Sequence, residues 1–125
     1  SITTMKEKNG WSIYIDNGKH KINDDLLETI KKYESYGVGE LIISSKDCDG
    51  IMNGFDYDLI KLVTKNVSIP VIASSGAGNI NHIERLIKET NCDAISLASL
   101  LHYNKLTIKE VKNKLKNKKI KVRFS

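Results

Sequence analysis

Short apolar runs alternate with amphipathic segments along most of this chain, and this alternation constrains the fold more than any other feature. Residues 41–43, 70–73 and 93–97 have the length and apolar character of buried parallel strands. Residues 11–15 alternate large apolar with smaller polar side chains and are predicted as a strand that precedes these three. Residues 16–18 carry the turn signal that ends it, in a hairpin or a loop.

A segment with helical spacing of apolar residues follows each predicted strand. The first helix is expected to begin after the capping residues Asn23 and Asp24 and to end before Gly37. The others are expected over residues 56–66, 81–90 and 107–117. Four βα units with short connections require parallel strands whose crossover helices cover the sheet. The predicted fold is therefore α/β: half of a (βα)8 TIM-type barrel, with a flavodoxin-like open sheet as the alternative.

Length and charge narrow the classes of function. We expect residues 1–125 to form a single half-barrel domain without a linker. Residues 105–125 contain nine Lys and Arg residues against Glu110, a balance of +8, so residues 1–104 carry −3 of the net +5. Such a charged end is explained by a solvated helix face, so we expect no nucleic-acid partner. Cys48 and Cys92 form no metal-binding or disulfide pattern.

Apolar runs in this chain are all too short to cross a membrane, and its first residues contain no signal-peptide core. We therefore expect a cytoplasmic protein with reduced thiols and no membrane partner. Neither a cofactor nor a metal ion is expected. The motifs that bind nucleotides through a glycine-rich loop are missing from the sequence.

Candidate site residues follow the predicted strands, because parallel α/β folds bind ligands beyond the carboxyl ends of their strands. Residues 74–78 read Ser-Ser-Gly-Ala-Gly, and such small residues leave several backbone N–H groups pointing outward at a helix start. Ala98 and Ser99 begin another helical turn after the next strand. Either loop alone could be no more than a tight βα turn, but two neighbouring loops of this kind favour a phosphate site.

An acidic loop follows the second buried strand. Asp47 and Asp49 stand two residues apart, and Gly50 permits a ligand to approach the backbone closely. By itself this pattern is equally typical of a solvated loop.

Longer strings resemble one known family. Residues 37–50 read GVGELIISSKDCDG, residues 53–56 NGFD, residues 69–78 IPVIASSGAG and residues 98–103 ASLLHY. They closely resemble the cyclase subunits of imidazole glycerol phosphate synthase, from histidine biosynthesis. The resemblance covers the whole chain, but only strands five to eight of the family's (βα)8 barrel.

This resemblance implies a lyase reaction. The family uses ammonia from a glutaminase partner to convert a bisphosphate ribonucleotide (PRFAR) into imidazole glycerol phosphate and the carboxamide ribonucleotide AICAR. The resemblance also implies that Asp49 faces the substrate and that the Gly50 amide contacts a phosphate. Gly76, Ala98 and Ser99 are implied to hold the distal phosphate, and Ser74 to lie beside the ammonia path.

Departures from the family pattern concern catalysis. Thr3 occupies the position of the family's strand-five catalytic aspartate, and a threonine cannot act as a carboxylate acid or base near neutral pH. The other catalytic aspartate belongs to strand one, outside the half that this chain matches. Asp47 and His102 match family positions without an assigned role. His102 stands in an apolar stretch and is predicted to be a packed, hydrogen-bonded histidine.

Two functions remain open at this level. The chain is either the carboxyl-terminal half of a cyclase, inactive alone and working with an amino-terminal half, or a non-catalytic half-barrel that binds a phosphorylated ligand or a protein partner. A four-stranded half-barrel leaves strand edges and an apolar face uncovered. We therefore expect self-association, or pairing with the missing half.

Overall fold

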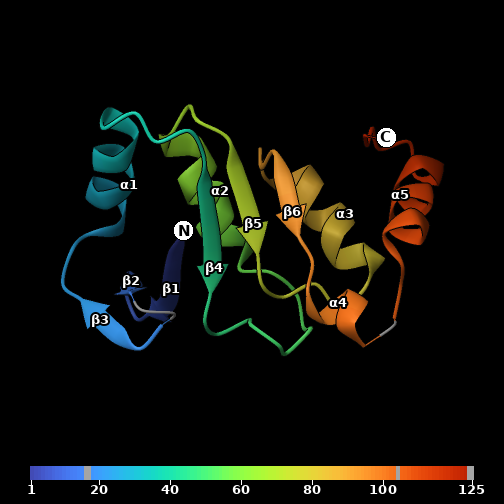
Figure 1. Cartoon of the computed structure of the whole chain (residues 1–125), viewed down its shortest axis with the longest axis horizontal. Coiled ribbons are helices and arrows are strands. Elements are labelled where there is room, and N and C mark those ends of the chain that lie inside the picture. Colours follow the sequence, from blue (N-terminus) through green and yellow to red (C-terminus); the bar gives the residue numbers. More distant parts are fainter. Residues whose placement is uncertain (16–17, 104, 124–125) are drawn as a thin grey trace.

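The structure is a computed structural model that describes residues 1–15, 18–103 and 105–123 (Figure 1). Within these residues six strands form one sheet in the order β3-β2-β1-β4-β5-β6. Their bounds are β1 Ile2–Glu7, β2 Gly10–Ile15, β3 His20–Ile22, β4 Leu41–Ser45, β5 Val71–Ser74 and β6 Ala94–Ser96. Strands β1, β4, β5 and β6 are parallel, whereas β2 and β3 form an antiparallel hairpin beside β1.

Helices connect the parallel strands, as the apolar spacing predicted. They are α1 Leu26–Ser35, α2 Tyr57–Asn66, α3 Ile80–Glu89, the short α4 Ser99–His102, and α5 Ile108–Asn117. Each long helix begins at a side chain that accepts a backbone N–H of the first turn, such as Asp56 on α2 and Thr107 on α5. Helix α1 is capped by Asp25 rather than by Asn23 or Asp24, so it begins slightly later than predicted.

The long helices cover one face of the sheet. In Figure 1, α2 and α3 lie behind β4, β5 and β6. Side chains on the helix-facing side of the parallel strands are buried, among them Ile2, Leu41, Ile43, Val71 and Ala73. Side chains that alternate with them are half-buried or exposed: Thr3, Ile42, Ser44, Ile72, Ser74, Ala94 and Ser96. We call this second side the open face.

One covered face and one open face decide between the two architectures that the sequence left open. A flavodoxin-like sheet has helices on both faces, whereas a barrel has them only on the outside. The arrangement is that of half a barrel, and the open face corresponds to the inner wall.

The first strand is a correction to the sequence analysis. Residues 11–15 do form a strand, β2, but it is antiparallel, and the parallel strand that begins the first βα unit is β1. The apolar pattern missed β1 because its centre carries Thr3 and Thr4, and Thr4 is fully buried although it is polar. Its hydroxyl donates to the Ser44 carbonyl oxygen at 3.0 Å, which allows burial. Residues 16 and 17 of the predicted turn lie outside the described residues.

None of the helices in the described parts of the chain has the length and apolar character needed to span a bilayer.

Candidate functional site

A row of hydroxyl groups crosses the open face, near the carboxyl ends of β4, β5 and β6 and continuing onto β1. Thr3 pairs with Ser44, Ser44 with Ser74, and Ser74 with Ser96, so the four residues stand side by side on four neighbouring strands. They point to the same face, because paired residues in a sheet share a side. Below them, Ile42, Ile72 and Ala94 form an apolar row in the same register. The polar side chains of this face therefore lie at the end of the strands where ligands are expected.

A small cleft lies at this end, between the loops that follow β5 and β6. Asp49, Met52, Ser74, Ser75, Gly76, Ala77, Ser96, Ala98 and Ser99 line it. Five of the six residues assigned by sequence to substrate or phosphate binding are thus brought together. The exception is Gly50, which lies outside this lining and has a positive φ of 74°.

The loop after β5 is shaped by close backbone contact with the loop that precedes α2. The Gly54 amide donates to the Gly76 carbonyl oxygen at 2.8 Å. A Cβ on Gly76 would overlap the Gly54 carbonyl oxygen, and the φ of Gly76 is +121°. Ser75 also has a positive φ, of 77°, a backbone angle that residues other than glycine rarely adopt. Glycine is therefore required at position 76 by loop packing, whether or not a phosphate binds beside it.

Below this loop, His82 on α3 fixes the direction of the Gly78 amide. The Gly78 N–H donates to His82 Nδ1 at 3.0 Å, so the ring accepts there and is unprotonated at this nitrogen. Burial lowers the pKa of His82, and the neighbouring Arg85 lowers it further. A neutral His82 therefore supports the loop at neutral pH, a role that the sequence did not suggest.

Helix α4 supplies the other wall of the cleft. Its first intrahelical donors are the amides of Leu101 and His102, which share the Ala98 carbonyl oxygen at 3.1 and 2.8 Å. The amides of Ser99 and Leu100 precede these donors, at the end of a helical turn where N–H groups have no intrahelical acceptor. Together with the small side chains of Ala98 and Ser99, this is the geometry expected where backbone amides meet an anion.

The two carboxylates of the acidic loop have different surroundings: one bonds to β1, and the other lines the cleft. Asp47 accepts the Lys6 amide at 2.6 Å and so fastens the loop to β1. Asp49 lines the cleft and accepts the Ser75 hydroxyl at 3.4 Å. Between them, burial raises the pKa of the Cys48 thiol, so Cys48 is not activated as a nucleophile.

His102 differs from its predicted environment. It is exposed on α4 rather than packed, and its ring meets the Tyr103 ring edge-on at 5.2 Å between centroids. The apolar stretch suggested burial, but in this four-residue helix only Leu100 is buried.

Sequence reasoning missed Lys46, the residue directly after β4. Together with Thr3, Ser44, Ser45, Asp49, Ser74 and Ser75 it lines a second hollow. Lys46 Nζ donates to the Gly18 carbonyl oxygen at 2.9 Å and lies 4.7 Å from the centre of the Tyr14 ring. Lys46 lies in one of the strings that resemble the family but was given no role, because its position depends on contacts with Gly18 and Tyr14 of the hairpin.

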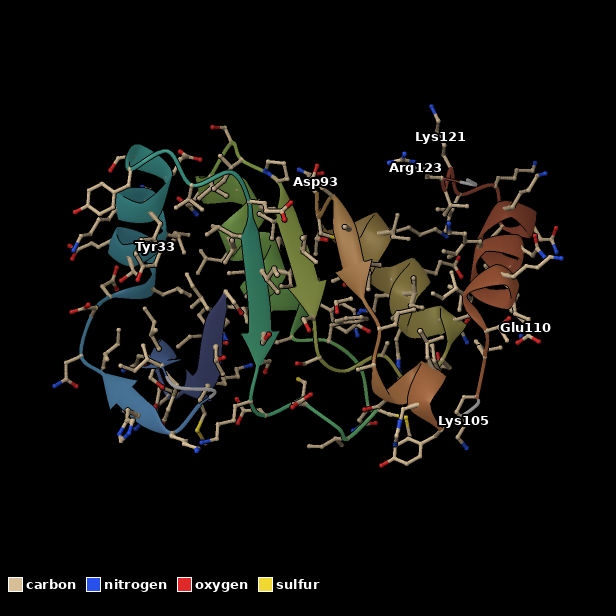
Figure 2. All side chains as sticks on the ribbon, in the orientation of Figure 1. Tyr33, Asp93, Lys105, Glu110, Lys121 and Arg123 are labelled. Carbon is tan, nitrogen blue, oxygen red and sulfur yellow. The ribbon has the colours of Figure 1, made fainter. Side chains whose placement is uncertain are left out.

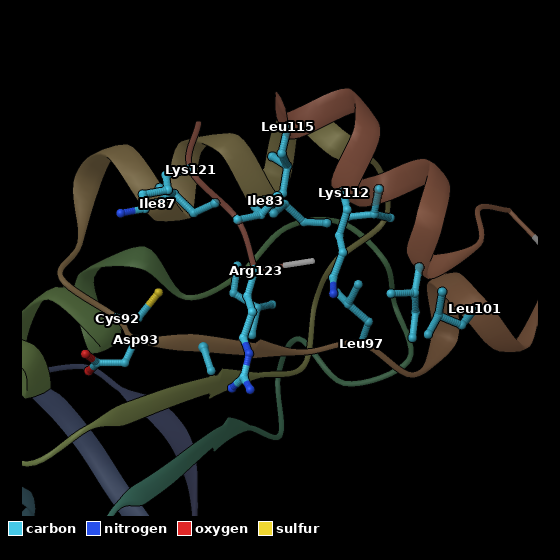
Figure 3. Close-up of a pocket in the computed structure, with 15 residues that line it drawn as sticks. Ile83, Ile87, Cys92, Asp93, Leu97, Leu101, Lys112, Leu115, Lys121 and Arg123 are labelled. Atoms are coloured by element: carbon cyan, nitrogen blue, oxygen red, sulfur yellow. The ribbon is translucent and has the colours of Figure 1, made fainter. Parts of the chain in front are cut away.

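A larger groove of about 470 Å³ lies elsewhere, between β6, α3 and α5 (Figure 3). Most of its wall is apolar, with Ile83 and Ile87 from α3 and Leu115 from α5. Helix α5 packs on α3, where Lys118 and Glu84 form an ion pair at 2.8 Å. Asp93, Lys112, Lys121 and Arg123 also line this groove, but none of the six sequence-predicted site residues does. We therefore place the candidate site in the cleft despite its smaller size.

Two residues of the basic end lie far from the cleft. Figure 2 shows Lys121 and Arg123 near Asp93, at the amino-terminal end of β6, whereas Lys105 lies at the end of the molecule that carries the loops. The basic residues are therefore not gathered on one side of the molecule: the tail lies away from the loops, whereas Lys105 lies at their end.

Comparison with known proteins identifies relatives for almost the whole chain. Residues 2–107 match the model of a family described as histidine biosynthesis protein. An imidazole glycerol phosphate synthase subunit HisF from Clostridium botulinum (strain Okra) is 42% identical over 119 residues, which cover 95% of this chain and 47% of the relative. The subunit HisF from Microcystis aeruginosa is 46% identical over 114 residues, covering 91% of this chain and 45% of the relative. The chain thus spans about half the length of the curated relatives it matches.

Proposed function

Since this chain belongs to the histidine biosynthesis protein family, we propose that it is the carboxyl-terminal half of a cyclase subunit of imidazole glycerol phosphate synthase. In this proposal it supplies one phosphate site of the (βα)8 barrel, formed by strands five to eight. The complete barrel would form imidazole glycerol phosphate from a bisphosphate ribonucleotide with ammonia from a glutaminase partner, in the cytoplasm. The relatives are named as subunits of the synthase that makes imidazole glycerol phosphate.

One observation carries the phosphate site: the loops after β5 and β6 line a single cleft. Its wall contains Ser74, Gly76, Ala98 and Ser99, which are small, uncharged residues. Backbone amides and hydroxyls in such an arrangement stabilise a phosphate without a cationic side chain. In this proposal Asp49 orients the ligand from the open side of the cleft.

Binding of inorganic phosphate tests this site directly. We expect phosphate to shift the NMR signals of the Ser75–Ala77 and Ser99–Leu100 amides, and Ser99→Glu to abolish these shifts because it places a carboxylate in the cleft. Ser35→Glu, at the end of α1, adds the same charge away from the cleft and should leave the shifts unchanged. Phosphate-induced shifts confined to other amides in wild-type protein would refute the site.

Catalysis requires residues that this chain does not itself provide. Thr3 lies on the open face in line with Ser44, at the mouth of the half-barrel. At this position the family resemblance implies an aspartate, and a hydroxyl cannot replace a carboxylate in general acid and base catalysis. The amino-terminal half, carrying the other acid, is the proposed partner, and it would cover the open face.

Reassembly with that half tests the catalytic proposal. We expect little ammonia-dependent cyclisation when this chain is mixed with a polypeptide that comprises the amino-terminal half of the Clostridium botulinum subunit. Thr3→Asp should raise the rate by about 10² or more, because a positioned acid or base typically contributes that much. Asn9→Asp, at an exposed position in the turn between β1 and β2, serves as a control for adding a carboxylate outside the mouth.

A second candidate function is favoured by Thr3 itself. Without the acid, a half-barrel that binds a phosphorylated ligand or a protein partner, and catalyses nothing, remains consistent with the cleft. Phosphate binding together with no cyclisation by reassembled Thr3→Asp protein would support this alternative over the cyclase.

A further inference from the structure

The loop before α2 and the loop after β5 are joined by two backbone contacts beside the cleft. The Gly54 amide donates to the Gly76 carbonyl oxygen at 2.8 Å. A Cβ on Gly78 would overlap the Met52 carbonyl oxygen, so the two backbones also touch there. Because both contacts involve backbone atoms, they fix the distance between the two loops. Side chains that bridge the loops are therefore held from both ends.

One pair of side chains bridges these loops at the cleft. The Ser75 hydroxyl donates to Asp49 Oδ1 at 3.4 Å. Ser75 is half-buried and Asp49 is exposed, and both line the cleft and the second hollow. Among the described residues that line the cleft, Asp49 is the charged one. A carboxylate repels a phosphate that binds close to it, so the position of Asp49 affects how well the cleft binds an anion.

Ser75 makes this contact in a strained backbone conformation. Its φ of 77° lies in the left-handed region that favours glycine, and Met52, another cleft residue, has a φ of 58°. Lys119 is the remaining described residue of this kind besides glycines, and it directly follows the C-cap of α5, where helices commonly end in this conformation. Strain at Ser75 has no such local cause, and glycine would relieve it. A serine at this position is therefore explained by what its side chain contacts.

We propose that Ser75 is a positioning residue whose hydroxyl holds the Asp49 carboxylate at the edge of the cleft, away from the backbone amides that bind phosphate. This inference rests on the proposed phosphate site and adds how that site accommodates a carboxylate in its wall. Ser75 acts through Asp49 and does not need to touch the phosphate. Without the hydroxyl, the carboxylate is released to approach the same amides, where it repels the phosphate and competes with it.

Phosphate titration in two backgrounds tests the proposal. We expect Ser75→Ala to weaken the binding of inorganic phosphate about threefold to tenfold, as followed by the NMR signals of the Ala77 and Leu100 amides. The same substitution in Asp49→Asn protein should change the affinity by less than about twofold, because that protein has no carboxylate to release. Dependence of the Ser75→Ala effect on Asp49 is the expected signature of positioning.

Ser75→Gly separates positioning from a purely structural role. It removes the hydroxyl and also relieves the backbone strain at this position. We therefore expect a higher urea midpoint of unfolding together with weaker phosphate binding. A side chain that only stabilised the loop would lower both quantities when it is removed, so a lower urea midpoint would contradict the proposal.

Ser68→Ala is the matched control. The Ser68 hydroxyl donates to Glu34 Oε2 at 3.2 Å, in the loop between α2 and β5, at the other end of β5 from the cleft. The substitution thus removes a serine-to-carboxylate contact of the same kind without touching the cleft. We expect it to leave the affinity for phosphate unchanged.

Every other result overturns the proposal, and the results are distinguishable. Unchanged or tighter phosphate binding by Ser75→Ala would refute the role of Ser75 and leave the phosphate site standing. An equal loss of affinity with and without Asp49→Asn would show that the hydroxyl acts on the phosphate or the loop, not through Asp49. Failure of inorganic phosphate to shift the cleft amides of wild-type protein would refute the phosphate site and this proposal together.

Discussion

Gly76 lies in a loop that lines the cleft and also packs against the backbone of a second loop. Its amide-rich loop faces the cleft, while its α-carbon faces the Gly54 carbonyl oxygen too closely for a side chain. The loop before α2 and the loop after β5 are thereby packed backbone to backbone, with the bond from Gly54 N–H to the Gly76 carbonyl oxygen between them. Loss of ligand binding on substitution of Gly76 would therefore not show that this residue touches the ligand.

Gly76→Ala should lower the free energy of unfolding by roughly 1 to 3 kcal/mol, because the new methyl group overlaps backbone and the positive φ is strained. Urea unfolding followed by circular dichroism measures this loss without any ligand. Gly39→Ala is the control, since a Cβ at Gly39 meets nothing within 4 Å. Equal stability of the two variants would contradict the packing argument.

Among the elements, the β2–β3 hairpin contacts the residue that caps α2. Trp11 Nε1 donates to Asp56 Oδ2 at 2.7 Å, and Asp56 Oδ1 accepts the Leu59 amide at 3.1 Å. One carboxylate thus begins α2 and anchors the hairpin that contacts Lys46. The same side chain therefore links the hairpin to the start of α2.

Asp56→Ala should destabilise the chain by more than the roughly 0.5 to 2 kcal/mol that loss of a helix cap costs, because it also frees the Trp11 indole. Asp25→Ala removes only the equivalent cap of α1, the bond to the Glu28 amide, and provides the matched comparison. Fluorescence of Trp11 should change in Asp56→Ala and stay constant in Asp25→Ala. The same fluorescence in both variants would mean that the hairpin is held by other contacts.

Helix α3 gives the cleft a dependence on pH through His82. Burial and Arg85 keep the folded-state pKa of His82 below its ordinary value, and Tyr57 packs beside it with its hydroxyl on the His82 carbonyl oxygen at 3.5 Å. In the unfolded chain His82 therefore binds a proton at higher pH than in the folded chain. Protonation at Nδ1 would also remove the acceptor of the Gly78 amide.

The contribution of His82 to stability should be present above about pH 6.5, its ordinary pKa, and decline as the pH falls below that value. The measurement is the free energy of unfolding between pH 5 and pH 7.5 (roughly the range in which histidine titrates). His82→Gln should flatten this dependence, whereas His102→Gln, at an exposed position, should preserve it. An unchanged slope in His82→Gln would exclude His82 as its source.

At the scale of the whole molecule, the open face and the sheet edge at β6 are the surfaces that a closed barrel would cover. Helices cover one side of the parallel strands, while Ile42 and Ile72 stand on the side that a barrel encloses. Among the residues that the structure describes, β6 pairs only with β5, and the apolar groove of Figure 3 lies between β6 and α5. Sheet edges and apolar faces of this kind promote association.

We expect the isolated chain to self-associate at micromolar concentration, as measured by sedimentation equilibrium. Ile72→Lys places a charge in the apolar row of the open face and should shift the chain toward monomer, because the charge would be buried on association. Ile51→Lys, on an exposed loop residue, is the control for added charge. A wild-type chain that stays monomeric at these concentrations would argue against exposed apolar surface on the open face.

The sequence by itself determined the four long helices and three of the four parallel strands. Apolar spacing predicted α1, α2, α3 and α5 within a few residues, as well as β4, β5 and β6. It could do so because each of these elements buries one of its sides, which leaves a recognisable pattern of apolar residues in the sequence. The loop residues of the cleft were also found from sequence, because small residues after parallel strands leave backbone N–H groups accessible. The resemblance to the cyclase family, now shown by comparison, rested on the same loops.

Only the tertiary structure decided the features that depend on pairing between distant segments. Strand β1 has a polar centre, and it is a strand because it pairs with β4 and β2, not because of its own pattern. Lys46 is held beside the second hollow because it contacts Gly18 of the hairpin, and His82 supports the Gly78 amide because α3 packs against the loop. The covered and open faces likewise follow from how the helices cross the sheet. Local periodicity records which side of an element is buried, whereas these contacts depend on what lies against it, and that is set by the assembled fold.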